Sequence, residues 1–571
     1  MPAAATGGAQ EAAGAGTATT ADVAAVTAAT AVASATTVAD VLLARAGQDE
    51  PALLVADRQW TYRELVEEAA RRAALFEQLR DADRPPHIGV LLENEPDYLF
   101  WLAAAALSGA VVVGINSTYR GDALGQLIRH SDCQLLVTST GQQPLLAGVD
   151  TGVAADRVLL VDDPDHIALV ARQQAEPPQR QAAPEDLLLL IFTSGSTGLP
   201  KAVRCTQGRY ARTGAHVAKI AQLGAGDVVY SPLPFFHSSS LFTGWSSALN
   251  AGIPIATRSK FSASNTLPDV RRFGATMITY TGKVLNYILA TPERPDDADN
   301  PLRLAVGNEA SARDIRDFAR RFGCTVRDSY GSTEGIIIIR RDPAMPEGAL
   351  GVADPTVKVL DPDTGLECPP VTLGADGRPT NLDVAVGEIV ETAPTGGFEG
   401  YYRNEAATQA RFRDGWYWSG DLAYRDADGW LYFAGRSNEW LRVDGENFAA
   451  APVEAIVGRY PDARSVAVYA VPDDPVGDRV MVALELRGGA EFDPAAFDAF
   501  LADQPDLGPK WVPAFVRVTQ ELPKLASMKI DKMRLRREAW QADQVVWRPG
   551  KGEPLRRLDE ADRTRLATLL G

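Results

Sequence analysis

Leu187–Val203 reads LLLLIFTSGSTGLPKAV, and this stretch decides the fold. An unbroken apolar run, 187–192, leads into a loop of glycines and hydroxyls, and Lys201 follows. A continuous apolar run that ends in glycines is typical of a strand buried on both faces of a parallel sheet. The loop offers backbone N–H groups and hydroxyls, which stabilise anionic oxygens, and the lysine adds a positive charge. The stretch therefore predicts a polyphosphate-binding loop at the end of a buried strand.

Two other interpretations of the loop stay open at this point. GSTG by itself also fits an ordinary polar turn. The Walker pattern requires GK followed by Ser or Thr, whereas Leu199 and Pro200 here separate Gly198 from Lys201, and Ala202 follows. A P-loop kinase or ATPase is therefore the weaker phosphate-binding interpretation.

The composition is that of a soluble globular protein, with 46% hydrophobic and 23% charged residues among 571. A net charge of −17 argues against nucleic-acid partners, which need basic surface. The four cysteines form no CxxC pair, which favours reduced thiols and a cytoplasmic location.

The first 36 residues are rich in Ala, Thr and Gly, and no Lys or Arg precedes Arg45. This pattern lacks the basic start and apolar middle of a secretion signal, so we expect a disordered low-complexity extension over 1–36. No apolar run elsewhere is long enough to span a membrane, although peripheral membrane contact stays open.

Short apolar runs alternate with helical patterns through the first half, which predicts α/β architecture. Thr61 and Glu64 form a capping box before a helix, and 87–113 reads as strand, helix and strand. Of two later runs, 228–236 leads to His237 and 302–310 contains Gly307. Ligands bind at the carboxyl ends of such strands, although a lone histidine is more often a packing residue.

Asp328–Gly335 reads DSYGSTEG and places an aromatic ring, hydroxyls and a carboxylate between glycines. Tyr330 could stack on a flat base, Thr333 could hold a phosphate oxygen, and Glu334 could bind Mg²⁺. A solvated turn is the alternative for this motif standing alone.

The pattern of predicted strands and helices changes after about residue 437. Strand patterns at 464–471, 480–486 and 514–519, a helix near 494–502 and a basic helix from Asp531 predict a small α+β domain. Residues 546–571 read as a charged tail.

Four motifs occur in one order: TSGSTGLPK, YGSTEG, WSGDLAYRDADGWLYFAGR and LPKLASMKIDKMRLR. Together they resemble the adenylate-forming superfamily, and the likeness runs from about 38 to about 537. The amino-acid sequence in and around these motifs is most similar to the long-chain and very-long-chain fatty acyl-CoA synthetase branch, which includes the fatty acid transport proteins. The resemblance implies a large domain of α/β sheets with a distorted barrel subdomain over 37–437. It also implies a small mobile α+β domain over 438–545.

The resemblance implies roles for individual residues. The residues implied to bind the β- and γ-phosphates of ATP are Thr193, Ser194, Gly195, Ser196, Thr197, Gly198 and Lys201. The residues implied around the rest of the nucleotide and the pantetheine path are Gly307, Tyr330, Gly331, Thr333, Asp421, Arg436 and Gly445. Catalysis is expected from Lys529, Thr333, Glu334 and His237, with Glu334 as the Mg²⁺ ligand.

The implied activity is that of an ATP-dependent acyl-CoA synthetase for a fatty or steroid side-chain acid, with ATP, Mg²⁺ and CoA as cofactors. A ligase that loads a carrier protein and a non-catalytic lipid-binding protein are the alternatives. The oligomeric state stays open.

Three departures from the family pattern stand out. Asn438 occupies a hinge position where Asp or Lys is usual, and Met528 precedes Lys529 where Gly is usual. Lys524 and Lys532 flank Lys529 as further candidates for the catalytic lysine. A Trp gate on the acyl tunnel is not expected, because Leu241 stands near that position and Trp245 comes later.

Overall fold

The computed structural model describes Val32 and most residues from 34 to 567. The described ranges are 34–193, 200–282, 284–342, 344–374, 379–436, 440–443, 446–472, 478–504, 506–525, 528–542, 544–550 and 553–567. The predicted extension over 1–36 therefore lies almost entirely outside the described residues.

The strand before the phosphate loop forms where the sequence predicts it. This strand, β7 (Leu187–Thr193), runs parallel to β4 and antiparallel to β8, so Lys201 opens the second arm of a hairpin. Leu188, Leu189 and Leu190 are buried, as expected of a strand covered on both faces. The strands of this six-stranded sheet are, in spatial order, β6 (Val158–Leu160), β5 (Leu135–Thr138), β3 (His87–Leu91), β4 (Val111–Gly114), β7 and β8 (Lys201–Thr206).

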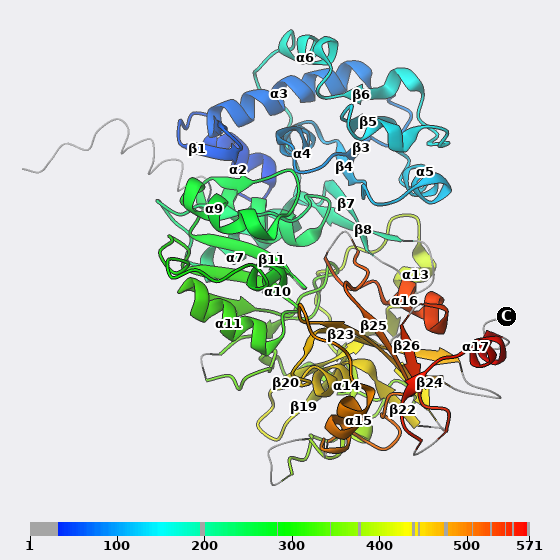
Figure 1. The fold of residues 1–571 in the computed structure, drawn as a ribbon. Coiled ribbons are helices and arrows are strands. Elements are labelled where there is room, and N and C mark those ends of the chain that lie inside the picture. The colour runs from blue at the N-terminus through cyan, green and yellow to red at the C-terminus, as the bar shows by residue number, and fades with distance from the viewer. Residues whose placement is uncertain are drawn as a thin grey trace, which may run out of the picture.

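A second sheet of seven strands lies beside the first, drawn mainly in green in Figure 1. Its neighbours pair in parallel except for the antiparallel pair β1 and β2. Its spatial order is β13 (Thr325–Asp328), β12 (Leu304–Asn308), β11 (Met277–Thr281), β9 (Val229–Tyr230), β10 (Ile255–Thr257), β1 (Pro51–Val55) and β2 (Arg58–Thr61).

Helices join the two sheets into one hydrophobic core that includes the buried α4. The predicted capping box is present at the start of α3, where the Thr61 side chain accepts from the Glu64 N–H. The helices of this region are α2 (Val38–Arg45), α3 (Tyr62–Leu79), α4 (Pro96–Ser108), α5 (Gly121–His130), α6 (Pro164–Ala171), α7 (Gln207–Ile220), the π-helix η3 (Ser239–Ser246), α8 (Ser247–Ala251), α9 (Ala263–Phe273), α10 (Val284–Leu289) and α11 (Ala312–Phe322). Two 3₁₀ turns are η1 (Gln143–Leu146) and η2 (Ala155–Arg157).

An antiparallel sheet follows, in the region where the resemblance implies a distorted barrel subdomain. Its strands pair in the order β16, β17, β19 and β18, with β20 on β19. The elements are β14 (Ile339–Arg340), β15 (Val352–Ala353), β16 (Val357–Leu360), α12 (Leu382–Ala385), β17 (Gly387–Glu391), α13 (Glu405–Gln409), β18 (Phe412–Arg413), β19 (Trp416–Arg425) and β20 (Leu431–Arg436). We call the part of the molecule from α2 to β20 the large lobe.

The remaining elements form the small lobe, drawn from yellow to red in Figure 1. Each strand and helix expected between 464 and 538 is present, and Asp531 caps α16 by accepting from the Arg534 N–H at 2.9 Å. The elements are β21 (Trp440–Val443), β22 (Glu446–Ala449), α14 (Ala450–Val457), β23 (Ala463–Pro472), β24 (Asp478–Leu486), α15 (Pro494–Ala502), β25 (Phe515–Thr519), α16 (Lys532–Glu538), η5 (Ala539–Gln541), β26 (Val545–Trp547), β27 (Arg556–Arg557) and α17 (Glu560–Ala567). The predicted boundary at 437 and 438 lies outside the described residues.

The segment expected to be a charged tail is part of the small lobe's sheet. β26 pairs with β25, and β27 pairs with β26. Trp547 is buried, and its indole N–H donates to Asp562 of α17 at 3.2 Å. The expectation of a separate tail over 546–571 is therefore wrong for residues 546–567, because a three-residue apolar strand among charged neighbours shows no recognisable period.

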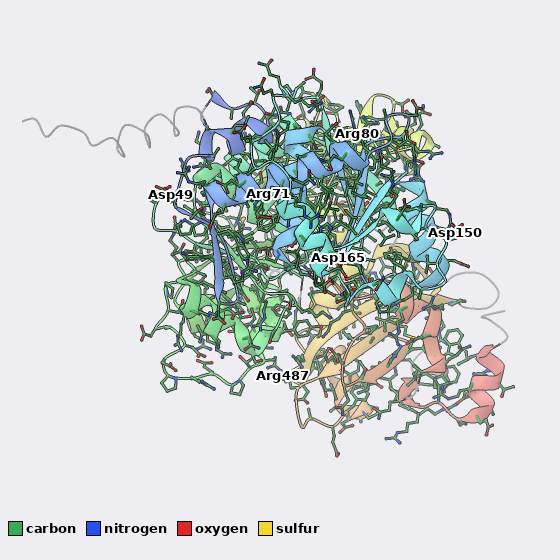
Figure 2. The ribbon with its side chains drawn as sticks, turned by 90° about the horizontal axis from the view of Figure 1, so that it is seen from above. Asp49, Arg71, Arg80, Asp150, Asp165 and Arg487 are labelled. Carbon is green, nitrogen blue, oxygen red and sulfur yellow. The ribbon has the colours of Figure 1, made fainter. Side chains whose placement is uncertain are left out.

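The lobes meet along one side of the large lobe, and Arg487 marks this boundary in Figure 2. Burial and the nearby Arg313 of α11 lower the pKa of Arg487. No helix within the described ranges is long and apolar enough to cross a membrane. The predicted fold class, an α/β large domain followed by a small α+β domain, is confirmed.

Candidate active site

A cavity of about 460 Å³ lies between the two lobes. Strands β7 and β8, the turn before η3, the YGSTEG loop and β19 line it from the large lobe. Leu525 and Lys529 line it from the small lobe. Predicted site residues that lie far apart in the sequence therefore meet here, namely Thr193, Lys201, His237, Gly331, Thr333, Glu334, Asp421 and Lys529.

Cations and hydroxyls gather at one end of the cavity, around Glu334. The Tyr401 hydroxyl donates to Glu334 Oε1 at 2.7 Å, and Arg411 Nη2 lies 4.0 Å from the same oxygen. Lys201 Nζ lies 5.2 Å from the centre of the Tyr401 ring. Burial and the charge of Arg411 lower the pKa of Lys201. Thr193 pairs in register with Lys201 and also lines the cavity. Two cations near one buried carboxylate suit a ligand with several negative oxygens.

The glycine-rich loop itself cannot be assigned a geometry. Ser194, Gly195, Ser196, Thr197 and Gly198 lie outside the described residues. The predicted phosphate contacts of these five residues therefore stay predictions.

Thr333 is fixed in the cavity wall by contacts with two other segments. Its Oγ1 lies 3.1 Å from Ser238 Oγ, in the turn that leads into the π-helix. Its carbonyl oxygen accepts a hydrogen bond from the Arg209 guanidinium of α7. A short π-helix beside a cavity is frequent at functional sites.

Tyr330 and Asp421 form a second polar pair. The Tyr330 hydroxyl donates to Asp421 Oδ2 at 2.7 Å, and Asp421 is 7% exposed. A carboxylate can accept several hydrogen bonds, which suits the hydroxyls of a sugar. Arg436 is paired in register with Asp421 between β20 and β19, and Gly445 lies outside the described residues.

Two buried polar atoms at the cavity have no hydrogen-bond partner among the described residues. They are His237 Nε2 and Asn308 Oδ1. Burial and the charge of Lys529 lower the pKa of His237 to about 4, so the ring is neutral at physiological pH. Unpaired buried polar atoms are costly, which favours a polar ligand at this point.

Gly307 has a packing role beside the cavity. A Cβ at this position would lie 2.2 Å from the Tyr280 carbonyl oxygen. The Gly307 carbonyl accepts from the Ser329 N–H at 2.8 Å, at the start of the YGSTEG loop. The next residue, Asn308, is the one that lines the cavity.

The structure separates the three candidate lysines of the last motif. Lys524 Nζ lies 3.7 Å from the centre of the Tyr287 ring, and Lys532 Nζ lies 3.0 Å from Glu454. Lys529 lines the cavity and pairs with Glu309 of the large lobe. Met528 has a φ of 64°, a left-handed conformation that favours glycine.

The two residues near the expected gate position lie in the π-helix η3. Leu241 and Trp245 are both buried within the π-helix, and Trp245 packs on Tyr210 with ring centres 6.1 Å apart. These side chains belong to the core of the large lobe.

Two regions of the chain match known protein-family models. Residues 42–402 match the AMP-binding enzyme model, and residues 452–529 match the model of the AMP-binding enzyme C-terminal domain. The chain belongs to the AMP-binding enzyme family. The predicted membership of the adenylate-forming superfamily is thereby confirmed.

Curated relatives extend over nearly the whole chain. The steroid-22-oyl-CoA synthetase of Rhodococcus jostii is 48% identical over 524 residues, which are 91% of this chain and 94% of the relative. The medium/long-chain-fatty-acid–CoA ligase FadD17 of Mycobacterium tuberculosis is 46% identical over 512 residues, which are 90% of this chain and 98% of the relative. The long-chain fatty acid transport protein 1 of Mus musculus is 29% identical over 522 residues, 85% of this chain and 79% of the relative. These relatives confirm the predicted long-chain branch of the family.

Solved structures of the family share the fold. The anthranilate CoA ligase AuaEII, in complex with anthranoyl-AMP, matches with a TM-score of 0.75 and 21% identity over 88% of this chain and 97% of that one. ATP-bound MatB from Rhodopseudomonas palustris matches with a TM-score of 0.73 and 23% identity over 87% of this chain and 98% of that one.

Sequence reasoning missed several residues that complete the site. Tyr401 and Arg411 lie outside the four motifs, and Ser238, Asn308 and Glu309 are polar residues that follow apolar runs. The weak signal for the last three was their position just after predicted strands, where ligands bind in α/β sheets.

Proposed function

We propose that this chain is an ATP-dependent acyl-CoA synthetase. It activates an apolar carboxylic acid to an acyl-AMP, releases pyrophosphate, and transfers the acyl group to CoA. The observation that carries this assignment is the meeting of Lys529 with Thr333, Glu334 and Asp421 in one cavity between the lobes. The named activities of the relatives at 48% and 46% identity support it.

Adenylation brings a carboxylate and a phosphate together, so positive charge must offset two anions in the transition state. The substrate carboxylate attacks the α-phosphorus, and pyrophosphate leaves. Lys529 Nζ would bridge the acyl carboxylate and the α-phosphate, Thr333 would donate to an α-phosphate oxygen, and Asp421 would accept from the ribose hydroxyls. Tyr330 would pack on adenine while its hydroxyl orients Asp421. Lys201 and Arg411 supply positive charge near the departing phosphates.

The residues around Glu334 fit a magnesium ion carried by the nucleotide. Mg²⁺ is usually held by one or two carboxylates together with substrate phosphates. Glu334 offers one buried carboxylate to the cavity. No cluster of three or more metal-binding side chains occurs within the described ranges, which agrees with an ion that the phosphates help to hold. A bound Mg²⁺ would neutralise phosphate charge as it develops.

The second step is attack of the CoA thiolate on the acyl carbon, which expels AMP. His237 is neutral, lines the cavity, and has an Nε2 without a hydrogen-bond partner among the described residues, so it would hold an acyl or phosphate oxygen. The resemblance implies a pantetheine path over 442–447, of which 442–443 and 446–447 lie in β21 and β22 of the small lobe. Rotation of the small lobe about the segment near Asn438 would bring them to the cavity, a hinge motion common among ligand-enclosing enzymes.

The acid is proposed to be a medium- or long-chain fatty acid or a steroid side-chain acid, as the names of the two relatives suggest. The test is pyrophosphate release with a graded series of fatty acids and steroid acids, with and without CoA. The expected result is release with apolar acids and formation of acyl-CoA and AMP when CoA is present.

Two outcomes would overturn the proposal. Acyl-AMP that is discharged by a phosphopantetheinylated carrier protein and not by CoA would indicate a carrier-loading ligase. Fatty-acid binding without pyrophosphate release would indicate a non-catalytic lipid-binding protein.

A further inference from the structure

One ion pair joins the lobes at the cavity. The Lys529 ammonium of the small lobe donates to Glu309 Oε1 of the large lobe, across 220 residues of sequence. The two side chains are 32% and 37% exposed. Exposed pairs of this kind stabilise a protein little, so the location of this pair needs another explanation.

The backbone on both sides of the pair is in an unfavourable conformation. Glu309 and Met528 both have a φ of 64°, in the left-handed region where side chains other than glycine are disfavoured. Such outliers persist where the surrounding structure imposes them, and they cluster at functional sites. Glu309 therefore has both the strained backbone and the carboxylate that contacts Lys529.

The surroundings place Glu309 next to the reacting groups. Its neighbour Asn308 lines the cavity, and its buried Oδ1 has no hydrogen-bond partner in the part of the chain that the structure describes. A Cβ on Gly282 would lie 3.4 Å from the Met528 carbonyl oxygen and 3.7 Å from Lys529 Cα. The loops after β11 and β12 therefore contact the lysine at its backbone and at its ammonium group.

We propose that Glu309 is the positioning residue that holds Lys529 in the adenylating arrangement. This inference rests on the proposed function and on the assigned role of Lys529. An ammonium group has three donors, so Lys529 can keep its bond to Glu309 while it contacts the acyl carboxylate and the α-phosphate. When the small lobe turns for thioester formation, the pair breaks, and Glu309 has no part in the second step.

The central experiment compares the two half-reactions in Glu309→Gln. Acyl-AMP formation is measured by single-turnover pyrophosphate release, and thioester formation is measured from supplied acyl-AMP and CoA. Small displacements of a reacting group can cost as much as 100-fold, so we expect adenylation to fall by about 10-fold. Thioester formation should stay within about twofold of the unaltered chain, because the pair is absent in that arrangement.

Three further variants separate positioning from structure. Glu309→Asp keeps the charge and should recover part of the adenylation rate. Glu309→Gly removes the charge and relieves the backbone, so it should lose adenylation without loss of thermal stability. Glu293→Gln is the matched control, because Glu293 pairs with Arg320 on the surface of the large lobe at 2.7 Å. Equal loss in both half-reactions, or no loss in either, would overturn the proposal.

A second readout does not depend on activity. Lysines of the resting chain are labelled with an amine-reactive acylating reagent, and the rate at each site is read by mass spectrometry. Lys529 should react several times faster in Glu309→Gln, whereas Lys532, paired with Glu454, should not change. An unchanged rate at Lys529 would refute the pair itself, whereas failure of the unaltered chain to release pyrophosphate would refute the proposed function alone.

Discussion

Tyr287 of α10 in the large lobe lies under the ammonium group of Lys524 in the small lobe, with Nζ 3.7 Å from the ring centre. The guanidinium carbon of Arg464, also in the small lobe, lies 5.7 Å from the same ring. Two cations on one aromatic ring stabilise the contact between the lobes.

Loss of this ring is predicted to weaken the adenylating arrangement. A cation–π contact is worth about 0.5–2 kcal/mol, so Tyr287→Leu should lower the rate of acyl-AMP formation by roughly 2- to 30-fold. Tyr287→Phe keeps the ring and should retain most of the rate. If the Phe and Leu variants were equally slow, the ring would not be the source of the stabilisation.

Lys529→Ala is predicted to slow adenylation far more than thioester formation. Removal of one group that stabilises transition-state charge typically costs about 100- to 1,000-fold, and we expect that loss in pyrophosphate release. The rate from supplied acyl-AMP should change little. Lys532→Ala is the control, since Lys532 pairs with Glu454 and lies outside the cavity. Equal slowing of both half-reactions by Lys529→Ala would contradict its assigned role.

Met528 and Met533 are predicted to respond oppositely to glycine and alanine. Met528 has a φ of 64°, so Met528→Gly should be more stable than Met528→Ala by about 1 kcal/mol. Met533 is 64% exposed on α16, where alanine should be the more stable by about 1 kcal/mol. Urea unfolding of the four variants measures both differences. The same order at both positions would show that the left-handed conformation is not maintained in solution.

His237 is predicted to make the fold less stable in acid. Burial, with the charge of Lys529, lowers its pKa from 6.5 to about 4 in the folded chain. Between these pH values the unfolded chain binds the proton and the folded chain does not, so stability falls as the pH falls. The loss is roughly 1.4 kcal/mol per pH unit across this range. Urea midpoints at pH 7 and pH 5 should differ less in His237→Gln than in the unaltered chain, and an equal difference would contradict the shift.

Local sequence patterns predicted the helices and strands. Contacts between residues far apart in the sequence could not be predicted. The buried strand at 187–193, the capping box at Thr61 and the small-lobe elements all follow from residues within a few positions of one another. The Glu334–Tyr401 contact spans 67 residues and the Lys529–Glu309 pair spans 220. Such pairs depend on how whole sheets and lobes pack, and no spacing in the sequence encodes them.

The choice of the catalytic lysine is a second case in which the structure adds what the sequence lacks. The motif predicted Lys529 from its spacing, but Lys524 and Lys532 had equal chemistry. The structure distinguishes them by their surroundings, since an aromatic ring holds one, Glu454 holds another, and the cavity receives the third. The role of Lys529 in catalysis stays a prediction until the half-reactions are measured.

The pairing of β26 with β25 matters to anyone who shortens or tags this protein. A chain cut at residue 544 would leave the side of β25 unprotected and uncover the face that Phe515 and Trp540 share with the Trp547 indole. Unpaired strand edges beside bare aromatic surface promote aggregation. Removal of the residues after 544 is therefore expected to make the protein aggregate.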